Sequence, residues 1–495
     1  MSTLHLAFDI GTTGTKAALL TPTSDLVRAS YRGYKTVRSS RGLAEQRAQN
    51  WWRAVIESSL ELGDLSHVEA VILTGQMQNL TLTDEQNEPL RPTLLYSDTR
   101  ARDEAEQLTQ EIGRAQLQQL TGNDQDAGSL LAKLLWLKRF EPRMLARAKT
   151  LFLGAADFVA AEMTGNRIAD TTTASTTGLM DLATRRPLSA DVFGQLGLER
   201  VLELLPEFVP GGTCVGALTA AAANTLGLKP GIPVYLAPGD AGAATVGAGS
   251  GEPGKAYGYI GTSGWVGFSA HERADPARGA FTLAHPHPDR FFQVAPLLTA
   301  GGNLQWIRDL FAHDQYEEFA DDSFDEVIEQ ALQRDPGPLL FLPYLNGERS
   351  PIRDSAARGA FIGLSSRTAK ADLYRAVLEG VIYSYRHALK VLLLGGIDAL
   401  TLTGGGTRSA AWNGLFSTVT GIPVDIIEEP ESVGVKGAHH SMRVAQGQTN
   451  SYSFGARTSM FTPDMTLKSH YDRMFRLYEG LYPNLRETFG ELALI

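Results

Sequence analysis

The chain has 495 residues, of which 43% are hydrophobic and 20% are charged, so it is a globular protein too long for a single hydrophobic core. The formal net charge is −10, from 45 Lys and Arg against 55 Asp and Glu. No basic surplus is available to neutralise a phosphate backbone, which argues against a non-specific nucleic-acid binder. A small phosphate compound, held by glycine amides and a metal, is not excluded.

Cys214 is the single cysteine and cannot pair within the chain, which fits a reducing compartment. We interpret it as a small buried residue. The first apolar run contains Asp9 and is too short for a signal peptide, while the apolar stretch 376–396 is interrupted by charged residues. We therefore expect a cytoplasmic protein with no membrane span.

In the first half, residues 4–10 and 15–20 are expected to form two strands joined by a tight glycine turn. Residues 47–63 have helical periodicity, and residues 68–75 have the pattern of a buried strand. A strongly helical stretch follows at 97–120, with Ser97 or Asp98 as its N-cap. Strands and helices alternate, which indicates an α/β fold.

The second half restarts this pattern. Residues 229–254 predict a strand, a glycine turn, a small-residue helix and a Gly/Pro-rich loop. Then "GYIGTSGWVGFS" repeats the strand, glycine turn and strand of "AFDIGTTGTKAALL". We place the domain boundary within residues 245–254, which gives domains 1–247 and 248–495. The last helix of the second domain is a candidate to pack back on the first.

Three further elements are expected in the second domain. "AGGNLQWIRDLF" leads a glycine pair into a helix, and a long amphipathic helix runs from Ala371 to about Leu394. The stretch 397–424 has the pattern of a strand, a triple-glycine turn, a helix and the start of another strand.

The first glycine turn matches neither familiar nucleotide loop. The spacing of Gly11 and Gly14 differs from a Rossmann fingerprint, and Lys16 is misplaced for a P-loop. What remains is a hairpin whose backbone N–H groups can converge on an anion, with threonine hydroxyls and Lys16 beside them. Asp9, at the end of the strand, is placed to hold Mg²⁺ through water. The alternative is an ordinary glycine hairpin with a surface aspartate.

The second hairpin, residues 261–264, favours the functional alternative, because two phosphate loops that open two similar domains suit a clamped nucleotide. A third site follows at residues 404–406, where glycines between a strand and a helix leave bare backbone for a base or ribose. Each signal alone is weak, but the ordered set indicates a nucleotide-binding cleft.

The motifs together resemble the FGGY family of carbohydrate kinases, within the actin-like ATPase and sugar kinase superfamily, over nearly the whole chain. The resemblance rests on "DIGTTGTK", "GGGTRSAAWNGLFSTVTGIPV" and the lysine and tryptophan of "AKLLWL". Within the family, "GQMQN", "PGDAGAATVGAG", "GTSG", "GERSP" and "RAVLEG" look most like xylulose kinases. It implies two RNase H-like domains, with ATP and sugar bound in the cleft between them.

The family's catalytic aspartate matches Asp240 in "PGDA", where a carboxylate can accept the proton of a sugar hydroxyl. The alternative for Asp240 is a helix N-cap. Met77 and Gln78 match the sugar-contacting pair, with Ala241 beside the base. Asp98 and Arg100 resemble another motif near the sugar, although a capped, solvated helix start explains them equally well.

The resemblance also assigns the nucleotide contacts: Gly11, Thr12, Thr13 and Lys16 on one side, and Gly261, Thr262, Gly301, Gln305, Gly404, Gly405 and Ser409 on the other. Trp306 and Trp412 follow these sites, but tryptophans at helical spacing are more often core residues.

Two positions and one helix depart from the xylulose kinase pattern. Gln78 stands where histidine is usual, and Ala241 where asparagine is usual. Each unpaired hydroxyl in a buried polyol site costs on the order of 1–3 kcal/mol, so these changes point to an altered sugar. His439 and His440 interrupt an alanine-rich helix, and we interpret them as packing or surface residues because no third metal ligand is spaced with them.

The resemblance implies an ATP-dependent, Mg²⁺-requiring kinase that phosphorylates a terminal hydroxyl of a small sugar. D-xylulose is the leading substrate, giving D-xylulose 5-phosphate. The alternatives are ribulose, erythritol, glycerol or gluconate, or a non-catalytic ATP-binding protein of the same superfamily. A homodimer is compatible with the family.

Overall fold

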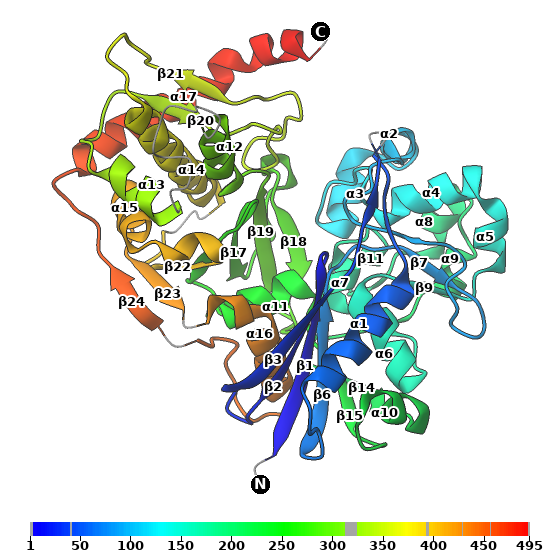
Figure 1. Cartoon of the computed structure of the whole chain (residues 1–495). Coiled ribbons are helices and arrows are strands. Elements are labelled where there is room, and N and C mark those ends of the chain that lie inside the picture. The colour runs from blue at the N-terminus through cyan, green and yellow to red at the C-terminus, as the bar shows by residue number, and fades with distance from the viewer. Residues whose placement is uncertain are drawn as a thin grey trace.

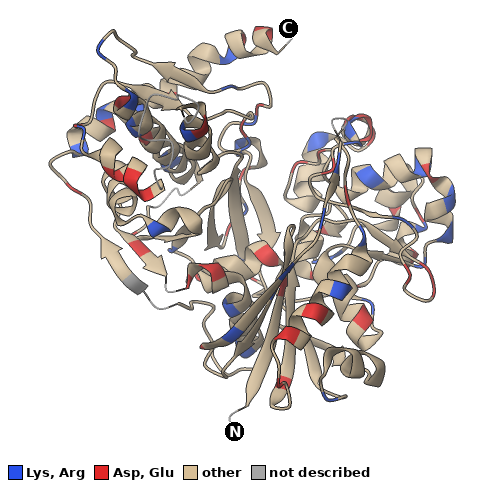
Figure 2. Cartoon of the chain, viewed as in Figure 1, with Lys and Arg blue, Asp and Glu red and all other residues tan. Residues whose placement is uncertain are grey.

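The computed structural model describes residues 3–39, 42–311, 324–392, 396–427, 429–455 and 457–493. It has two α/β parts, each built on a mixed sheet (Figure 1). No helix among these residues is long and apolar enough to cross a membrane. Lys and Arg are interspersed with Asp and Glu over both parts (Figure 2).

The first sheet has the strand order β14-β15-β6-β1-β2-β3. Its strands are β1 (Leu4–Ile10), β2 (Gly14–Leu20), β3 (Leu26–Gly33), β6 (Val68–Gly75), β14 (Thr213–Ala217) and β15 (Pro233–Leu236). Strands β1, β2 and β3 form an antiparallel meander, whereas β1, β6 and β15 run parallel. The predicted hairpin and the strand at 68–75 are therefore confirmed.

The second sheet repeats this arrangement in the order β18-β19-β17-β16-β22-β23-β24. Here β16, β17 and β19 form the meander, and β16, β22 and β23 run parallel. The strands are β16 (Ala256–Ile260), β17 (Gly264–Ala270), β18 (Phe281–Ala284), β19 (Phe291–Leu297), β22 (Leu400–Thr403), β23 (Val424–Ile427) and β24 (Arg457–Phe461). The internal repeat seen in the sequence thus corresponds to two sheets that share the order of six strands, with β18 added at one edge of the second sheet.

Helices cover each sheet and enclose its core. In the first part, α1 (Ala48–Glu61), α6 (Ala155–Thr164) and α10 (Ala220–Leu226) enclose fully buried residues such as Phe8 and Trp51. In the second part, α12 (Gly302–Phe311), α13 (Phe324–Leu332), α14 (Lys370–Leu392), α15 (Ala410–Thr420) and α17 (Lys468–Leu492) do the same. Trp412 is buried in this core, as predicted, and also lines the glycine pocket described below. Trp306 is half-buried and stacks on Phe341 at the edge of the core.

A separate helical cluster packs on the first part. Its helices are α2 (Arg102–Glu111), α3 (Arg114–Thr121), α4 (Leu130–Phe140), α5 (Pro142–Arg147), α7 (Thr171–Ser175), α8 (Ala190–Gln195) and α9 (Val201–Leu204). Short strands complete the fold: β4 (Val37–Arg38), β5 (Ala44–Gln46), β7 (Thr81–Thr83), β8 (Thr93–Leu94), β9 (Thr150–Phe152), β10 (Ile168–Asp170), β11 (Met180–Asp181), β12 (Arg186–Pro187), β13 (Glu207–Val209), β20 (Leu340–Leu342) and β21 (Ala360–Ile362).

The single helix expected at 97–120 is wrong. Two helices form instead, and Gly113 between them has φ +89°, a left-handed conformation that breaks a helix. Helix α2 begins only at Arg102 with Ala101 as its N-cap, so neither Ser97 nor Asp98 caps it. Cys214 also differs from its interpretation, because it lies exposed on strand β14.

Two helices lie at the junction between the sheets, and each contacts the sheet of the other half. Helix α11 (Asp240–Gly247) follows β15 of the first sheet and contacts β17 and β19 of the second. Helix α16 (Val433–Ala445) comes from the second half but packs on β1, β2 and β6. The last helix, α17, does not pack back on the first domain as suggested. It packs on α14, α15 and β20, and α16 is the helix that crosses (Figure 1).

Candidate active site between the two sheets

Three parallel strands of the first sheet end at the same edge. Ile10 of β1 pairs with Gly75 of β6, and Leu236 of β15 pairs with Leu73 of β6. Asp9, Met77–Gln78 and Asp240 lie at or just after these strand ends, although more than two hundred residues separate the first from the last. In open α/β sheets, ligands bind at the carboxyl ends of the parallel strands, in the crevice beside the loops that follow these strands.

Both carboxylates at this edge have a raised pKa. Burial raises the pKa of Asp9 to about 6, and the charge of Lys16 opposes this. Burial also raises the pKa of Asp240 to about 7, and the charge of Asp9 adds to the rise. The Asp240 carboxylate accepts a hydrogen bond from the N–H of Ala241 at 2.8 Å. An aspartate with a pKa near neutrality is suited to accept a proton in catalysis.

The first glycine hairpin is held firmly at its tip. Gly11 N–H donates to the carbonyl of Gly14 at 3.0 Å, and Gln46 Nε2 donates to the carbonyl of Thr12 at 2.7 Å. The Tyr34 hydroxyl donates to the carbonyl of Gly11. Thr13 is exposed at the tip. Such bracing presents the turn's backbone as a fixed surface, as an anion site requires.

The Lys16 ammonium lies close enough to Asp9 for their charges to interact, and it is bound by the second half of the chain. It lies opposite Asp9 in the β1–β2 register, and its ammonium donates to the carbonyl of Glu431 at 2.6 Å and to Ser432 Oγ at 3.2 Å. These acceptors belong to the 3₁₀ turn Pro430–Ser432, just before α16. Lys16 therefore joins the first hairpin to the second half of the chain in this structure.

On the sugar side, Met77 and Gln78 follow strand β6. A Cβ placed on Gly239 would lie 2.2 Å from Met77 Sδ, so Met77 packs directly against the residue before Asp240. Gln78 has φ +59°, a conformation that non-glycine residues rarely adopt. Met77 and Ala241 both border the small apolar cluster that contains Phe292. The predicted sugar-contacting pair therefore lies beside the predicted base.

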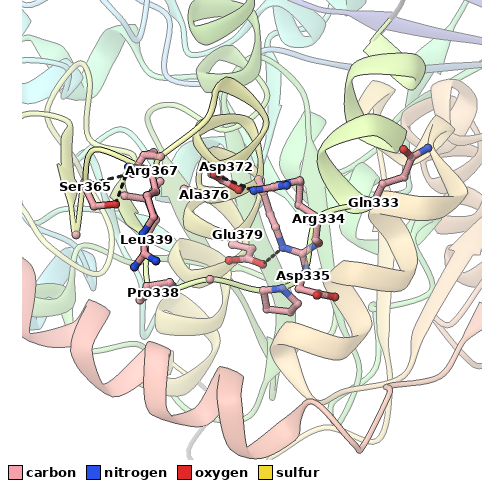
Figure 3. A pocket seen from close by; sticks show the side chains of 15 residues that line it. Gln333, Arg334, Asp335, Pro338, Leu339, Ser365, Arg367, Asp372, Ala376 and Glu379 are labelled. Atoms are coloured by element: carbon pink, nitrogen blue, oxygen red, sulfur yellow. Dashed lines mark hydrogen bonds and ion pairs between the residues drawn. The ribbon is translucent and has the colours of Figure 1, made fainter.

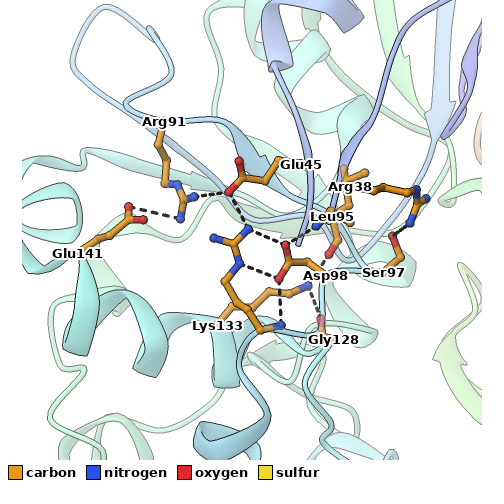
Figure 4. A network of polar contacts seen from close by, with 11 residues as sticks. Arg38, Glu45, Arg91, Leu95, Ser97, Asp98, Gly128, Lys133 and Glu141 are labelled. Atoms are coloured by element: carbon orange, nitrogen blue, oxygen red, sulfur yellow. Dashed lines mark hydrogen bonds and ion pairs between the residues drawn. The ribbon is translucent and has the colours of Figure 1, made fainter. Parts of the chain in front are cut away.

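Asp98 and Arg100 lie in a buried ion-pair network (Figure 4). Asp98 is fully buried, accepts from the N–H of Ala44 at 2.7 Å, and pairs with Arg100 at 2.7 Å. Arg100 also pairs with Glu45 at 2.7 Å, and Arg91 pairs with the same Glu45 oxygen at 2.6 Å. The interpretation as a capped, solvated helix start is wrong, because Asp98 is buried and α2 begins only at Arg102. Arg100 uses Nε and Nη2 for its carboxylate contacts, and its contact with the sugar stays a prediction.

The lysine and tryptophan of "AKLLWL" belong to the same network, which the sequence motif alone did not indicate. Lys133 is fully buried and donates to the carbonyls of Leu95 at 2.6 Å and Gly128 at 2.7 Å. Burial lowers its pKa to about 7. The Arg100 guanidinium lies 4.9 Å from the centre of the Trp136 ring. These hydrogen bonds and ion pairs connect separate segments of the first domain to one another.

Across from this edge, three glycine segments of the second half surround a pocket of about 740 Å³. Gly261 and Gly404 follow the neighbouring parallel strands β16 and β22. The N–H of Gly301 donates to the carbonyl of Gly261 at 2.8 Å, which joins the second hairpin to helix α12. Six predicted nucleotide residues line this pocket: Gly261, Thr262, Gly301, Gln305, Gly405 and Ser409.

Gly404 is close to this pocket without lining it. It has φ +95°, and a Cβ there would lie 2.6 Å from the carbonyl oxygen of Ile260. Ser409 Oγ accepts from the N–H of Trp412 at 3.3 Å and thereby caps α15. The triple-glycine turn therefore allows the chain that follows β22 to pack closely against the end of β16 before α15 begins.

The chemistry of the donor set fits a hydrated metal. Within the described residues, no group of three or more His, Cys, Asp or Glu side chains could hold an ion by itself. Asp9 and Asp240 provide one or two carboxylates, which suits Mg²⁺, because that ion retains water and binds substrate phosphates.

His439 and His440 are packing residues, as predicted. Both are buried, and His439 Nε2 lies 2.7 Å from His5 Nδ1. His440 Nε2 is hydrogen-bonded to the carbonyl oxygen of Ser451 at 2.7 Å.

A second pocket, of about 490 Å³, lies away from this site on the second domain (Figure 3). Four of its charged side chains form ion pairs. Arg334 pairs with Asp372 at 3.0 Å, and Arg375 pairs with Glu379 at 2.8 Å. The pocket shares no lining residue with the glycine-lined pocket.

Two sheets of like topology, a glycine-lined pocket and a pair of carboxylates at the facing edge define a phosphotransferase with a nucleotide site and an acceptor site. The N-terminal domain of the FGGY family of carbohydrate kinases matches residues 4–247, and its C-terminal domain matches residues 256–438. The chain belongs to the FGGY family of carbohydrate kinases. The predicted two-domain α/β kinase fold is thereby confirmed.

Relatives that are named for different sugar substrates align with most of the chain. It is 31% identical to the xylulose kinase of Escherichia coli strain K12, over 99% of this chain and 98% of that protein. It is 27% identical to the gluconokinase of Bacillus subtilis strain 168, over 87% of this chain and 86% of that protein. The solved xylulose kinase of Rhodospirillum rubrum superimposes with a TM-score of 0.87 at 27% identity, covering 98% of this chain and 100% of that one.

Proposed function

We propose that this protein transfers the γ-phosphoryl group of ATP to the terminal hydroxyl of D-xylulose, with Mg²⁺ as the metal, to form D-xylulose 5-phosphate. Kinases of the family act on sugars with ATP and a divalent metal. The observation that carries the proposal is the position of Asp240. It lies beside Met77 at the strand edge, with a pKa raised to about 7.

Asp240 accepts the proton of the attacking hydroxyl. Phosphoryl transfer needs mainly positioning, charge stabilisation and one base to orient the acceptor. Met77 and Gln78 orient the sugar beside this base. The braced turn at Thr12 and Thr13 contacts the transferring phosphate from one side, and Thr262 contacts it from the other.

Asp9 is the carboxylate on the metal side. When bound, the metal neutralises charge that develops on the transferred group. The adenosine occupies the pocket lined by Gly301, Gln305 and Gly405. Approach of the two domains excludes water, which would otherwise compete with the sugar hydroxyl for the phosphoryl group.

A second substrate class follows from two residues. Gln78 and Ala241 stand where xylulose kinases usually carry histidine and asparagine, and Ala241 cannot donate a hydrogen bond through its side chain. A gluconate, ribulose, erythritol or glycerol kinase is therefore the alternative. A gluconokinase is among the relatives of this chain.

The test is a screen of ADP formation with ketopentoses, polyols and sugar acids in the presence of ATP and Mg²⁺. We expect D-xylulose to have the highest kcat/KM and its product to be the 5-phosphate. A higher kcat/KM for any other acceptor would replace D-xylulose as the substrate. ADP formation with none of them would favour the non-catalytic alternative.

A further inference from the structure

A loop of the second half reaches the first domain beside the sugar-side residues. Arg349 Nη2 lies 2.8 Å from Asp126 Oδ2, and the Arg349 guanidinium lies 4.5 Å from the centre of the Phe281 ring. Arg353 pairs with Asp124 and lies 3.7 Å from Asp126. Two arginines of one domain thus meet two aspartates of the other.

This ion-pair cluster borders the predicted sugar site. The N–H of Gly128 donates to Asp126 Oδ1 at 2.8 Å. A Cβ placed on Gly128 would lie 3.0 Å from Asp126 Oδ1 and 3.9 Å from Gln78 Nε2. Gln78 follows Met77, which packs on the residue before Asp240. Gln78 therefore lies near the turn that holds Asp126, on the side of the predicted base.

The charges of this cluster are balanced. The positive charges of Arg349 and Arg353 face the negative charges of Asp126 and Asp124. The neighbouring Glu348 accepts from the N–H groups of Leu298 at 2.9 Å and of Arg349 at 2.7 Å. A substrate carboxylate that approaches Arg349 must compete with Asp126, and it also meets the Asp126 charge.

An uncharged ketose or polyol meets no such competition. A hydroxyl can donate to a carboxylate oxygen or accept from the guanidinium without separating the two charges. The guanidinium is held between Asp126 and Phe281, so little side-chain freedom is lost when a substrate contacts it.

We propose that the Arg349–Asp126 pair, formed across the two domains, is a specificity-determining element that favours uncharged sugars over sugar acids at this site. The inference rests on the proposed function and deepens it, because it selects ketoses and polyols among the alternatives. Discrimination arises from a group that repels the wrong substrate as well as from groups that bind the right one.

The test compares binding of two probes, D-xylulose and D-gluconate, to the full chain by calorimetry, so that turnover is not required. In the Asp126→Asn variant, Arg349 loses its compensating charge. We expect the ratio of the gluconate Kd to the xylulose Kd to fall at least about tenfold relative to the wild type. The matched control is Asp124→Asn in the same loop, since Asp124 pairs with Arg353 rather than with Arg349. We expect its ratio to change less than about threefold.

Three results would overturn the inference. These are a ratio unchanged in Asp126→Asn, an equal fall in Asp124→Asn, or binding of neither probe by the folded wild type. If Asp126→Asn does not fold, Arg349→Gln makes the same test with the opposite sign. Asp126, left with only Arg353 at 3.7 Å, then repels gluconate more strongly, and the ratio rises. Absence of kinase activity in the ADP screen, with the ratio behaving as expected, would contradict only the proposed function.

Discussion

The Asp9 carboxylate packs directly against Gly434 at the start of helix α16. A Cβ placed on Gly434 would lie 2.5 Å from Asp9 Oδ2, closer than two such atoms can approach. Two residues 425 positions apart in the chain are thus in direct contact, and the Asp9 carboxylate has its present position because residue 434 lacks a side chain.

Gly434→Ala is expected to lower kcat about tenfold, because the new methyl group displaces the Asp9 carboxylate from the metal side of the site. The melting temperature should fall little, since a carboxylate at the end of a side chain can rotate and alanine favours a helix by up to about 1 kcal/mol. Steady-state kinetics at varied Mg²⁺ and thermal unfolding check both parts.

The matched control for Gly434 is Gly490→Ala in helix α17, where nothing lies within 4 Å of the added methyl group. Its activity should equal that of the wild type. A Gly434→Ala enzyme with unchanged kcat and Mg²⁺ dependence would show that Asp9 does not need its present position.

The pH dependence of the reaction should follow Asp240. Its pKa is raised to about 7, chiefly by burial and then by the charge of Asp9, and the base must be ionised to accept a proton. We therefore expect kcat/KM to rise with pH up to about 7 and then level off. A profile of initial rates from pH 5 to 9 measures this.

Asp240→Asn should lower kcat by about 10²–10⁴, the usual contribution of a general base, and its residual rate should lose the rise near pH 7. ATP binding should persist, because the glycine pocket is unaltered. Retention of more than a few per cent of the rate, or of the same pH profile, would assign the base to another group.

The raised pKa of Asp240 also predicts how stability depends on pH. The folded state holds the Asp240 proton up to about pH 7, whereas the unfolded chain releases it near the ordinary value of 3.8. Stability from this group is therefore lost as the pH rises from about 4 to 7. The melting temperature of Asp240→Asn relative to the wild type should be higher at pH 8 than at pH 4, as calorimetry can measure; no change in this difference would contradict it.

Arg100→Ala should destabilise the protein by about 3–5 kcal/mol, because it leaves the fully buried Asp98 without its partner. Denaturant unfolding measures this loss. Arg53→Ala is the control, since Arg53 and Glu57 are exposed and 3.9 Å apart, and it should change stability by less than about 0.5 kcal/mol. A raised sugar KM with unchanged stability in Arg100→Ala would instead indicate direct sugar contact.

Gly405→Val should raise the KM for ATP without raising the KM for the sugar. Gly405 lines the 740 Å³ pocket, and nothing lies within 4 Å of a Cβ there, so the new side chain enters the pocket itself. Gly194→Val in helix α8 is equally uncrowded and lies elsewhere, so its ATP KM should stay at the wild-type value. Nucleotide titration at saturating sugar separates the two variants, and equal ATP KM values would place the nucleotide elsewhere.

Much of the fold was readable from local patterns. The two glycine hairpins, the strand at 68–75 and the strand, glycine turn and helix at 397–424 all form where predicted, because each depends on residues close together in the chain. The helical stretch at 97–120 failed because Gly113 adopts a left-handed conformation that overrides the helical periodicity on both sides.

The candidate site, like the fold, could be predicted only in part from local sequence patterns. Six residues predicted to bind the nucleotide line one pocket, since each of their three glycine segments follows or precedes a regular element of known direction. Lys16 and Arg100 have partners on other segments that the sequence did not indicate: Glu431 and Ser432 for Lys16, and Glu45 for Arg100. Local sequence patterns do not record such partners.

Local patterns along the chain were enough to predict the doubled α/β plan, the glycine turns and the place of Asp240 after a strand, because hydrogen-bonding geometry and side-chain periodicity act over a few residues. Long-range packing, which no local pattern records, brings α16 to the first sheet, Gly434 to Asp9 and Arg349 to Asp126. Those contacts depend on which strands pair and how two sheets face each other, and burial and charge at that interface then determine the chemistry of the site.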